Sequence, residues 1–204
     1  MKTTQTGGAV ITVMAALLLA ACTVVDLDAE GKPVMPQDPN AKASFSSQTP
    51  QQIAESSWQS KVIDAARQQG LSWADMKTKS ATVPADSNES VFVQASGKVT
   101  AFDEGNGRER SLTMTINGEP VKVLVGPLLR GNAIRDAAGF RFEQFTNQVQ
   151  YAQLTRALNR HAVKQLPPLD ASWVNQQVQA LLAVTMGHNS VESVVAVSLT
   201  REDP

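Results

Sequence analysis

Two groups of segments with alternating apolar and polar residues, separated by a long helical pattern, restrict the folds that this chain can adopt. In the first group, apolar residues recur at every second position over residues 91–101, 112–116 and 121–125, as they do in half-buried strands. Asn117-Gly118 joins the second and third of these segments. This pair is typical of a two-residue hairpin turn, because both central positions of a type I′ turn need positive φ. The pattern predicts a three-stranded antiparallel meander.

Residues 125–158 carry the chain from the third strand into a helix. Gly126 and Pro127 end the strand, and residues 132–138 are predicted to form a short helix. A longer helix is expected to run to about Lys164. We interpret its apolar residues as two faces, each covered by a different part of the protein. One face holds Phe142, Phe145, Val149 and Ala152, and the other holds Tyr151, Leu154 and Leu158.

Two further strands complete the predicted sheet. Alternation returns over residues 178–186 and 195–199, after Pro167-Pro168 has broken the helix. Three strands, a helix and two strands are the order of the OB-fold. We therefore predict a mainly β protein, an OB-fold-like five-stranded antiparallel barrel with an N-terminal helical extension. Gly97 fits this fold, because a glycine inside a strand suggests a bulge or bend. An open antiparallel sheet with helices on one face is the alternative.

The N-terminal extension has its own start signals. Thr49-Pro50-Gln51-Gln52 matches a capping box with proline at the first helical position. A second, short helix is expected from Ser72. We interpret Trp58 and Trp73 as core residues, although either ring could serve as a platform for a ligand.

The first residues resemble a bacterial lipoprotein signal. Lys2 precedes an apolar stretch at residues 9–20, which is short for a membrane span, and Leu19-Ala20-Ala21-Cys22 follows. The resemblance implies cleavage before Cys22, lipidation of its thiol and acylation, for example with palmitate. A secretory signal with a chance cysteine is the alternative. Thr23, rather than Asp, follows the cysteine, which by resemblance implies the outer membrane, facing the periplasm.

These signals divide the chain into four predicted parts. Residues 1–21 form a lipoprotein signal peptide, residues 22–48 a flexible tether, residues 49–90 a helical segment and loop, and residues 91–204 the barrel. The tether is rich in proline and polar residues and poor in apolar ones. We expect the membrane to be a partner through acylated Cys22.

Composition argues against several functions. The 18 basic and 19 acidic residues give a net charge of −1, whereas a nucleic-acid binder usually carries a basic surplus. His161 and His188 are far apart in sequence and there is no second cysteine, so we expect no metal and no cofactor. No nucleophile elbow is present, and we expect no enzymatic activity. An enzyme would need a carboxylate pair that only the fold brings together.

The candidate ligand-binding residues are Arg130, Arg135, Asp136, Asn147 and Tyr151. Arginines beside a chain reversal can hold a carboxylate or phosphate through paired hydrogen bonds. Together with Asp, Asn and an aromatic ring they also form the set of side chains that sugar sites use. In the alternative interpretation, these residues satisfy the hydrogen bonds of their own loop.

Two motifs in this region resemble a known family. Residues 125–136 (VGPLLRGNAIRD) and 145–152 (FTNQVQYA) are similar to the signature of a family of predicted periplasmic lipoproteins of unknown function. The resemblance extends over residues 58–199, and only the segment between Met76 and Ser90 is shorter than the family pattern. Its members are often encoded beside sugar ABC transporters, which implies a link to carbohydrate uptake without a defined activity.

The sequence supports two classes of function. The first is a lipid-anchored binding or accessory protein that holds a small saccharide or docks a component of a transporter. The second is a structural or assembly lipoprotein that binds another protein of the cell envelope. Both fit a tethered barrel without evident catalytic residues.

Overall fold

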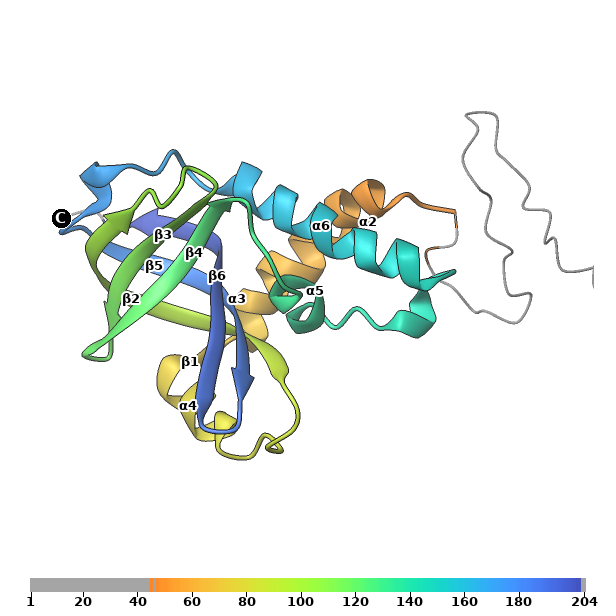
Figure 1. Cartoon of the computed structure of the whole chain (residues 1–204), viewed down its shortest axis with the longest axis horizontal. Helices are drawn as coiled ribbons and strands as arrows, with labels where there is room; N and C mark the ends of the chain where they lie inside the picture. Colours follow the sequence, from red (N-terminus) through yellow and green to blue (C-terminus); the bar gives the residue numbers. More distant parts are fainter. Residues whose placement is uncertain (1–44, 46, 203–204) are drawn as a thin grey trace, which may run out of the picture. The chain divides into compact units, whose positions relative to one another are not determined.

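Five strands close into a barrel in the structure, a computed structural model that describes Phe45 and residues 47–202 (Figure 1). Pairing runs in the order β2-β3-β4-β6-β5, and β5 pairs back to β2. The long helix lies between β4 and β5 in sequence, so the predicted OB-fold-like barrel is confirmed. The strands are β2 (Glu89–Asp103), β3 (Glu109–Ile116), β4 (Glu119–Pro127), β5 (Gln177–Gly187) and β6 (Ser190–Arg201).

One pair of strands departs from the prediction of an antiparallel barrel. β4 and β6 run parallel and share one pair of partners, Leu124 and Val195. The other four contacts around the ring are antiparallel. A closed ring with an odd number of strands cannot alternate direction throughout, so at least one neighbouring pair must be parallel. The barrel is therefore mixed, and its parallel seam is the shortest of the five.

Strand β2 lies very close to β3 at Gly97. A Cβ atom at Gly97 would overlap the backbone oxygen of Thr115. The register shift between these strands comes slightly later, between Val99 and Ala101. Gly97 thus provides the close approach, and the bulge beside it bends β2 around the barrel.

The buried residues form two cores on opposite faces of the same strands. One fills the barrel interior and includes Val99, Leu112 and Met114. The other lies between the outside of the barrel and the helices, and Ala183 and Val195 face it. β5 and β6 are therefore buried on both faces, which explains the continuous apolar stretch at residues 194–197.

The N-terminal extension forms as predicted and packs on the barrel. α2 (Pro50–Ser57) has the full capping box of Thr49 and Gln52, and it continues through a π-helical stretch, η2 (Trp58–Asp64), into α3 (Ala65–Gln69). Trp58 and Trp73 are both buried, as predicted. A short parallel strand, β1 (Leu71–Ser72), then pairs with β2, and α4 (Trp73–Ser80) begins at a Ser72 cap.

The long helix, α6 (Gln148–Gln165), begins later than its apolar pattern suggests. Phe142 lies in a separate turn, η3 (Phe142–Gln144), where its side chain is 48% exposed, and Val149 is 51% exposed. The first predicted apolar face is therefore wrong. The helix buries one stripe, made of Leu154, Thr155, Ala157, Leu158, Asn159 and Ala162.

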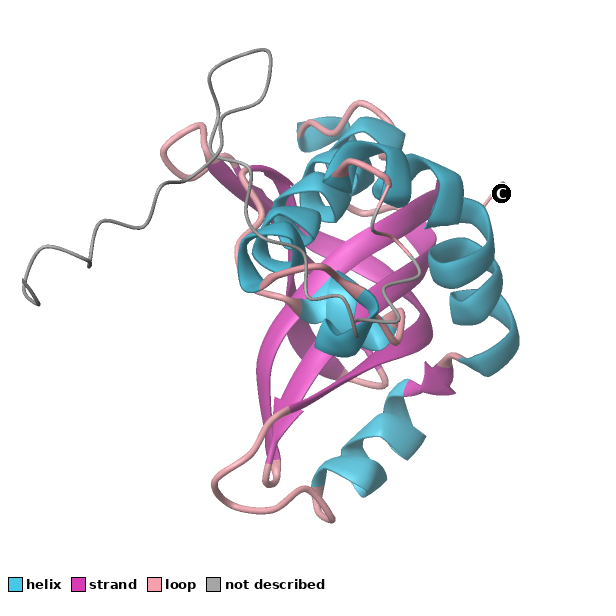
Figure 2. Cartoon of the chain, turned by 90° about the vertical axis from the view of Figure 1, so that its right-hand side faces the viewer, coloured by secondary structure: helices cyan, strands magenta, loops and turns pink. Residues whose placement is uncertain are grey.

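The helices other than α4 pack around the outside of the strands (Figure 2), whereas Trp73 and Met76 of α4 belong to the core of the barrel interior. α6 lies against α2 of the N-terminal extension. α5 (Ala133–Ala137) occupies the connection from β4 to α6. None of the helices within residues 47–202 is long and apolar enough to cross a membrane.

The predicted signal peptide and Cys22 lie outside the described residues, as does most of the tether. Phe45, at the end of the predicted tether, stacks on Phe145 with ring centres 5.3 Å apart. The side chain of Gln150 donates hydrogen bonds to the backbone oxygens of Phe45 and Gln48, each at 3.0 Å. The folded part therefore includes residues that precede Thr49.

The contact at Gly97 generates a stability prediction. Gly97→Ala should lower the free energy of unfolding by about 3 kcal/mol, because the new methyl overlaps the β3 backbone. Gly118→Ala is the control: its added Cβ meets open space, and only its φ of +82° is unfavourable, at about 1 kcal/mol. Urea denaturation measures both. Equal effects would contradict a close approach at Gly97.

Candidate functional site

Arg135 is the most buried charged residue of the predicted site. Its side chain comes from α5, and the residue is only 9% exposed. Nε donates to Oδ1 of Asp136 at 2.8 Å, and Nη1 donates to Oγ1 of Thr155 at 3.1 Å. The guanidinium carbon lies 3.9 Å from the centre of the Tyr151 ring. Protein groups thus fix the orientation of the guanidinium.

Tyr151 is held by its hydroxyl as well as by the Arg135 guanidinium over its ring. Its hydroxyl donates a hydrogen bond to the backbone oxygen of Phe140 at 3.0 Å. Burial raises the pKa of this phenol, and the nearby charge of Arg135 acts in the opposite direction. The hydroxyl therefore remains protonated near neutral pH and keeps its role as a donor.

The other two predicted residues lie apart from this cluster. Asn147 is the N-cap of α6, where its side chain accepts a hydrogen bond from the backbone N–H of Gln150 at 2.9 Å. Arg130 is exposed, and its Nε donates to Glu109 of β3 at 2.6 Å. The fold thus brings together Arg135, Asp136 and Tyr151. Their contacts match the alternative in which these residues stabilise their own loop, and ligand binding by the set stays a prediction.

A larger feature adjoins these residues: a cavity of about 770 Å³ between the β4–α5 loop and one face of α6. Four arginines line it, so we call it the arginine cleft: Arg130, Arg135, Arg156 and Arg160. Two of them come from the loop and α5, and two come from α6. The first pair, Arg130 and Arg135, is among the predicted ligand-binding residues, and the second pair is not.

Buried polar side chains of α6 hold the loop that forms the far wall of the cleft. Nδ2 of Asn159 donates to the backbone oxygens of Leu129 and Gly131, at 3.2 and 3.1 Å. Oγ1 of Thr155 donates to Oδ1 of Asn132 at 3.2 Å. The loop is therefore fixed against the helix, and the shape of the cleft is set by the fold.

The cleft carries a surplus of positive charge. Glu109 partly neutralises Arg130, and Asp136 partly neutralises Arg135. Arg156 and Arg160 are exposed and form no ion pair within the described residues. They are four residues apart and so project from neighbouring turns on one side of α6. No carboxylate is among the residues that line the cavity, which suits it to an anion.

The two histidines take part in packing and backbone contacts. The ring of His161 lies 4.7 Å from that of Trp58, and Nδ1 of His188 is 2.8 Å from the backbone oxygen of Val83. Within residues 47–202, no cluster of three His, Cys, Asp or Glu side chains could hold a metal ion.

Arg135 should contribute to stability far more than Arg130. Arg135→Ala removes the partner of Asp136 and leaves buried Thr155 without its donor, so the free energy of unfolding should fall by about 2–3 kcal/mol. Arg130→Ala is the matched control from the same cleft, and its exposed ion pair should be worth less than about 1 kcal/mol. Chemical denaturation of both variants measures the difference. A mild effect of Arg135→Ala would show that its contacts are dispensable.

His161 should titrate below the normal range of histidine. Burial against Trp58 lowers its pKa, the charge of Lys164 lowers it further, and Glu55 opposes both. The unfolded state then binds the proton more tightly, so this contribution to stability is complete above about pH 6.5 and is lost as pH falls below it. NMR titration of the imidazole tests this, and Lys164→Gln should raise the midpoint. A midpoint at or above that of free histidine would contradict the prediction.

Comparison with known proteins identifies the family of the chain. No curated protein matches the chain. A family model described as "Predicted periplasmic lipoprotein (DUF2291)" matches residues 12–200. That match covers the barrel, its helices and part of the N-terminal region that resembles a lipoprotein signal. The chain therefore belongs to this family of predicted periplasmic lipoproteins.

Proposed function

We propose that this lipoprotein is a non-catalytic accessory protein that binds a small anionic ligand in the arginine cleft. One observation carries the proposal: four arginines line a single cavity that no carboxylate lines. Arginine side chains stay protonated throughout the physiological range, so they hold anions well but do not exchange protons with a substrate. The chemistry of the cleft therefore favours binding over catalysis.

The residues of the cleft favour a ligand that combines an acid group with an apolar face. Arg156 and Arg160 offer planar forks that match a carboxylate or a phosphate. Leu128, which is 44% exposed, stands with Pro127 at the edge of the cleft. A sugar acid or a sugar phosphate has both features, and the link to carbohydrate uptake that the family resemblance implies favours the same ligands.

We also propose that the protein lies at the outer membrane, facing the periplasm, with acylated Cys22 as its anchor.

Binding can be tested by thermal shift and calorimetry on the full chain, purified from the cell envelope in detergent. Glucuronate, galacturonate and glucose 6-phosphate at millimolar concentration should raise Tm, whereas uncharged glucose should raise it less. Added salt should weaken the effect, because the attraction is electrostatic. Failure of every anion to change Tm would count against the proposal.

Variants locate the site. Arg156→Ala and Arg160→Ala should each weaken binding of the best anion about tenfold or more, because a charge-assisted hydrogen bond contributes about 1.5–3 kcal/mol. Arg108→Ala removes the same charge from an exposed turn outside the cleft and should leave affinity unchanged. Equal losses in all three variants would point to a general effect of net charge instead.

A further inference from the structure

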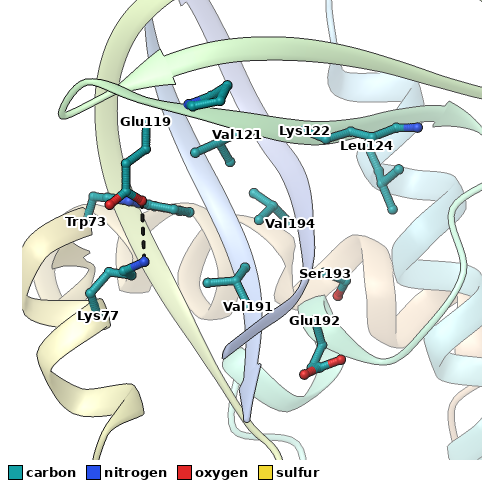
Figure 3. A pocket seen from close by; sticks show the side chains of 11 residues that line it. Trp73, Lys77, Glu119, Val121, Lys122, Leu124, Val191, Glu192, Ser193 and Val194 are labelled. Carbon is teal, nitrogen blue, oxygen red and sulfur yellow. Dashed lines mark hydrogen bonds and ion pairs between the residues drawn. The ribbon is translucent and has the colours of Figure 1, made fainter. Parts of the chain in front are cut away.

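The parallel seam of the barrel opens into a wedge. Beyond the single pair of Leu124 and Val195, the register continues towards Glu119 and Ser190, but the strands separate. A cavity of about 390 Å³ lies between them (Figure 3). Both strand edges line it, and Trp73 of α4 adds a wall. We call this cavity the seam wedge.

Along β4, the backbone groups of alternate residues face the seam wedge, where β6 provides no register partner before Leu124. Ile116 and Glu119 flank the two-residue turn and are register partners, so they exchange hydrogen bonds across the hairpin. Alternation along the strand then turns the backbone of Pro120 and Lys122 away from β3 and towards β6. Proline at position 120 agrees with this, because it has no N–H and is tolerated only at a free edge. Lys122 therefore offers one donor and one acceptor at the wedge.

The floor of the seam wedge is apolar and reaches the barrel core. Val121 and Val194 are 6% and 4% exposed, and they face each other from the two strands, with Val191 beside them (Figure 3). Apolar residues on an incoming chain would pack against these side chains.

A buried donor without a protein acceptor lies at the same place. Trp73 is 5% exposed, and its Nε1 has no hydrogen-bond partner within the described residues. Trp173 is buried to the same degree, but its Nε1 donates to the backbone oxygen of Pro168 at 3.0 Å. Buried donors are rarely left unpaired, because the lost hydrogen bond to water is not replaced. The indole N–H of Trp73 is thus a donor in the wall of the wedge that no protein group satisfies within the described residues.

An exposed ion pair is among the residues that line the seam wedge. Nζ of Lys77 lies 3.4 Å from Oε2 of Glu119, and both side chains are about half exposed. This exposed ion pair holds α4 to β4 weakly and can open at little cost. The charges of the lining, Lys77 and Lys122 against Glu119 and Glu192, balance to zero. Unlike the arginine cleft, the wedge has no surplus charge to attract an anion.

We propose that the seam wedge binds an extended, uncharged peptide segment of another envelope protein as an added strand between β4 and β6. A peptide backbone supplies donors and acceptors at the spacing of the free strand edge. Alternate apolar side chains of the segment pack on Val121 and Val194, and one of its carbonyls accepts the N–H of Trp73. The neutral lining matches a segment with little net charge. This site is independent of the arginine cleft.

A library of random heptapeptides displayed on phage tests the proposal against the full chain in detergent. Selected peptides should be rich in alternating apolar residues. In NMR spectra, binding should move the indole N–H signal of Trp73 more than those of Trp58 and Trp173. Hydrogen exchange of the Lys122 amide should slow at least tenfold. Library selection that yields no peptide, or peptides that leave Trp73 and Lys122 unchanged, overturns the proposal.

Matched variants distinguish an effect on this site from an effect on folding and from an effect on the arginine cleft. Trp73→Phe keeps an aromatic ring but removes the unpaired N–H, and it should weaken the binding of a selected peptide about tenfold. Lys122→Pro should fold, since the amide it removes does not pair with β3, and it should abolish binding, whereas Lys122→Ala retains it. Arg156→Ala should leave peptide affinity unchanged, so failure of the anion proposal is distinguishable. A dimer in sedimentation velocity that perturbs Trp73 would identify a second copy as the occupant and overturn the partner proposed here.

Discussion

The parallel contact between β4 and β6 is the constraint on which the rest of the molecule depends. Five strands in a ring must include one parallel pair, and here that pair has a single point of register, Leu124 with Val195. A seam this short contributes little hydrogen bonding, so other elements must shield the strands around it. On the outside, Leu124 and Val195 pack into the core beneath the helices. On the inside, Trp73 and the barrel core cover the strands where they separate. α4 and α6 thus each contact a strand of the seam.

The arginine cleft is a consequence of how α6 is held in place. Its buried stripe faces the barrel, and the polar members of that stripe, Thr155 and Asn159, bind the β4–α5 loop. Arg156 and Arg160 follow those two residues by one position each, so they project beside the loop. Arg135 completes the wall through its contacts with Asp136 and Tyr151. A buried network thus fixes the positions of exposed charges, which is an efficient way to preorganise a binding surface.

Sequence patterns predicted the local structure well because each pattern reports a local requirement. Asn117-Gly118 gave the hairpin, since few other residues accept positive φ at two successive positions. Thr49 and Gln52 gave the start of α2 through a capping box that forms as expected. Alternation placed all five strands of the barrel, but alternation says which face of a strand is buried and not which strand lies beside it. The alternation therefore could not predict the parallel seam.

The same limit explains the errors at the candidate site. Phe142 and Val149 fit a helical apolar face by spacing, yet α6 begins only at Gln148 and both side chains stay exposed. Arg156 and Arg160 look like an ordinary solvated face of a helix, because nothing in their spacing reveals that residues 127–132 return beside them. Arg130 and Arg135 were conspicuous only because they lie close to glycines in the connection from β4 to α6.

The two cavities differ in the charge and in the groups that they offer to a partner, although β4 contributes to both. Pro127, at the end of β4, borders the arginine cleft, while residues 119–122 and Leu124 line the seam wedge. In the cleft, unbalanced arginine charge attracts an anion of almost any shape, so specificity has to come from the fixed loop. In the wedge the charges cancel, and recognition rests on backbone groups at strand spacing and on a buried indole N–H. In the two proposals, the cleft therefore takes a small anion and the wedge takes a protein chain, and neither surface can replace the other.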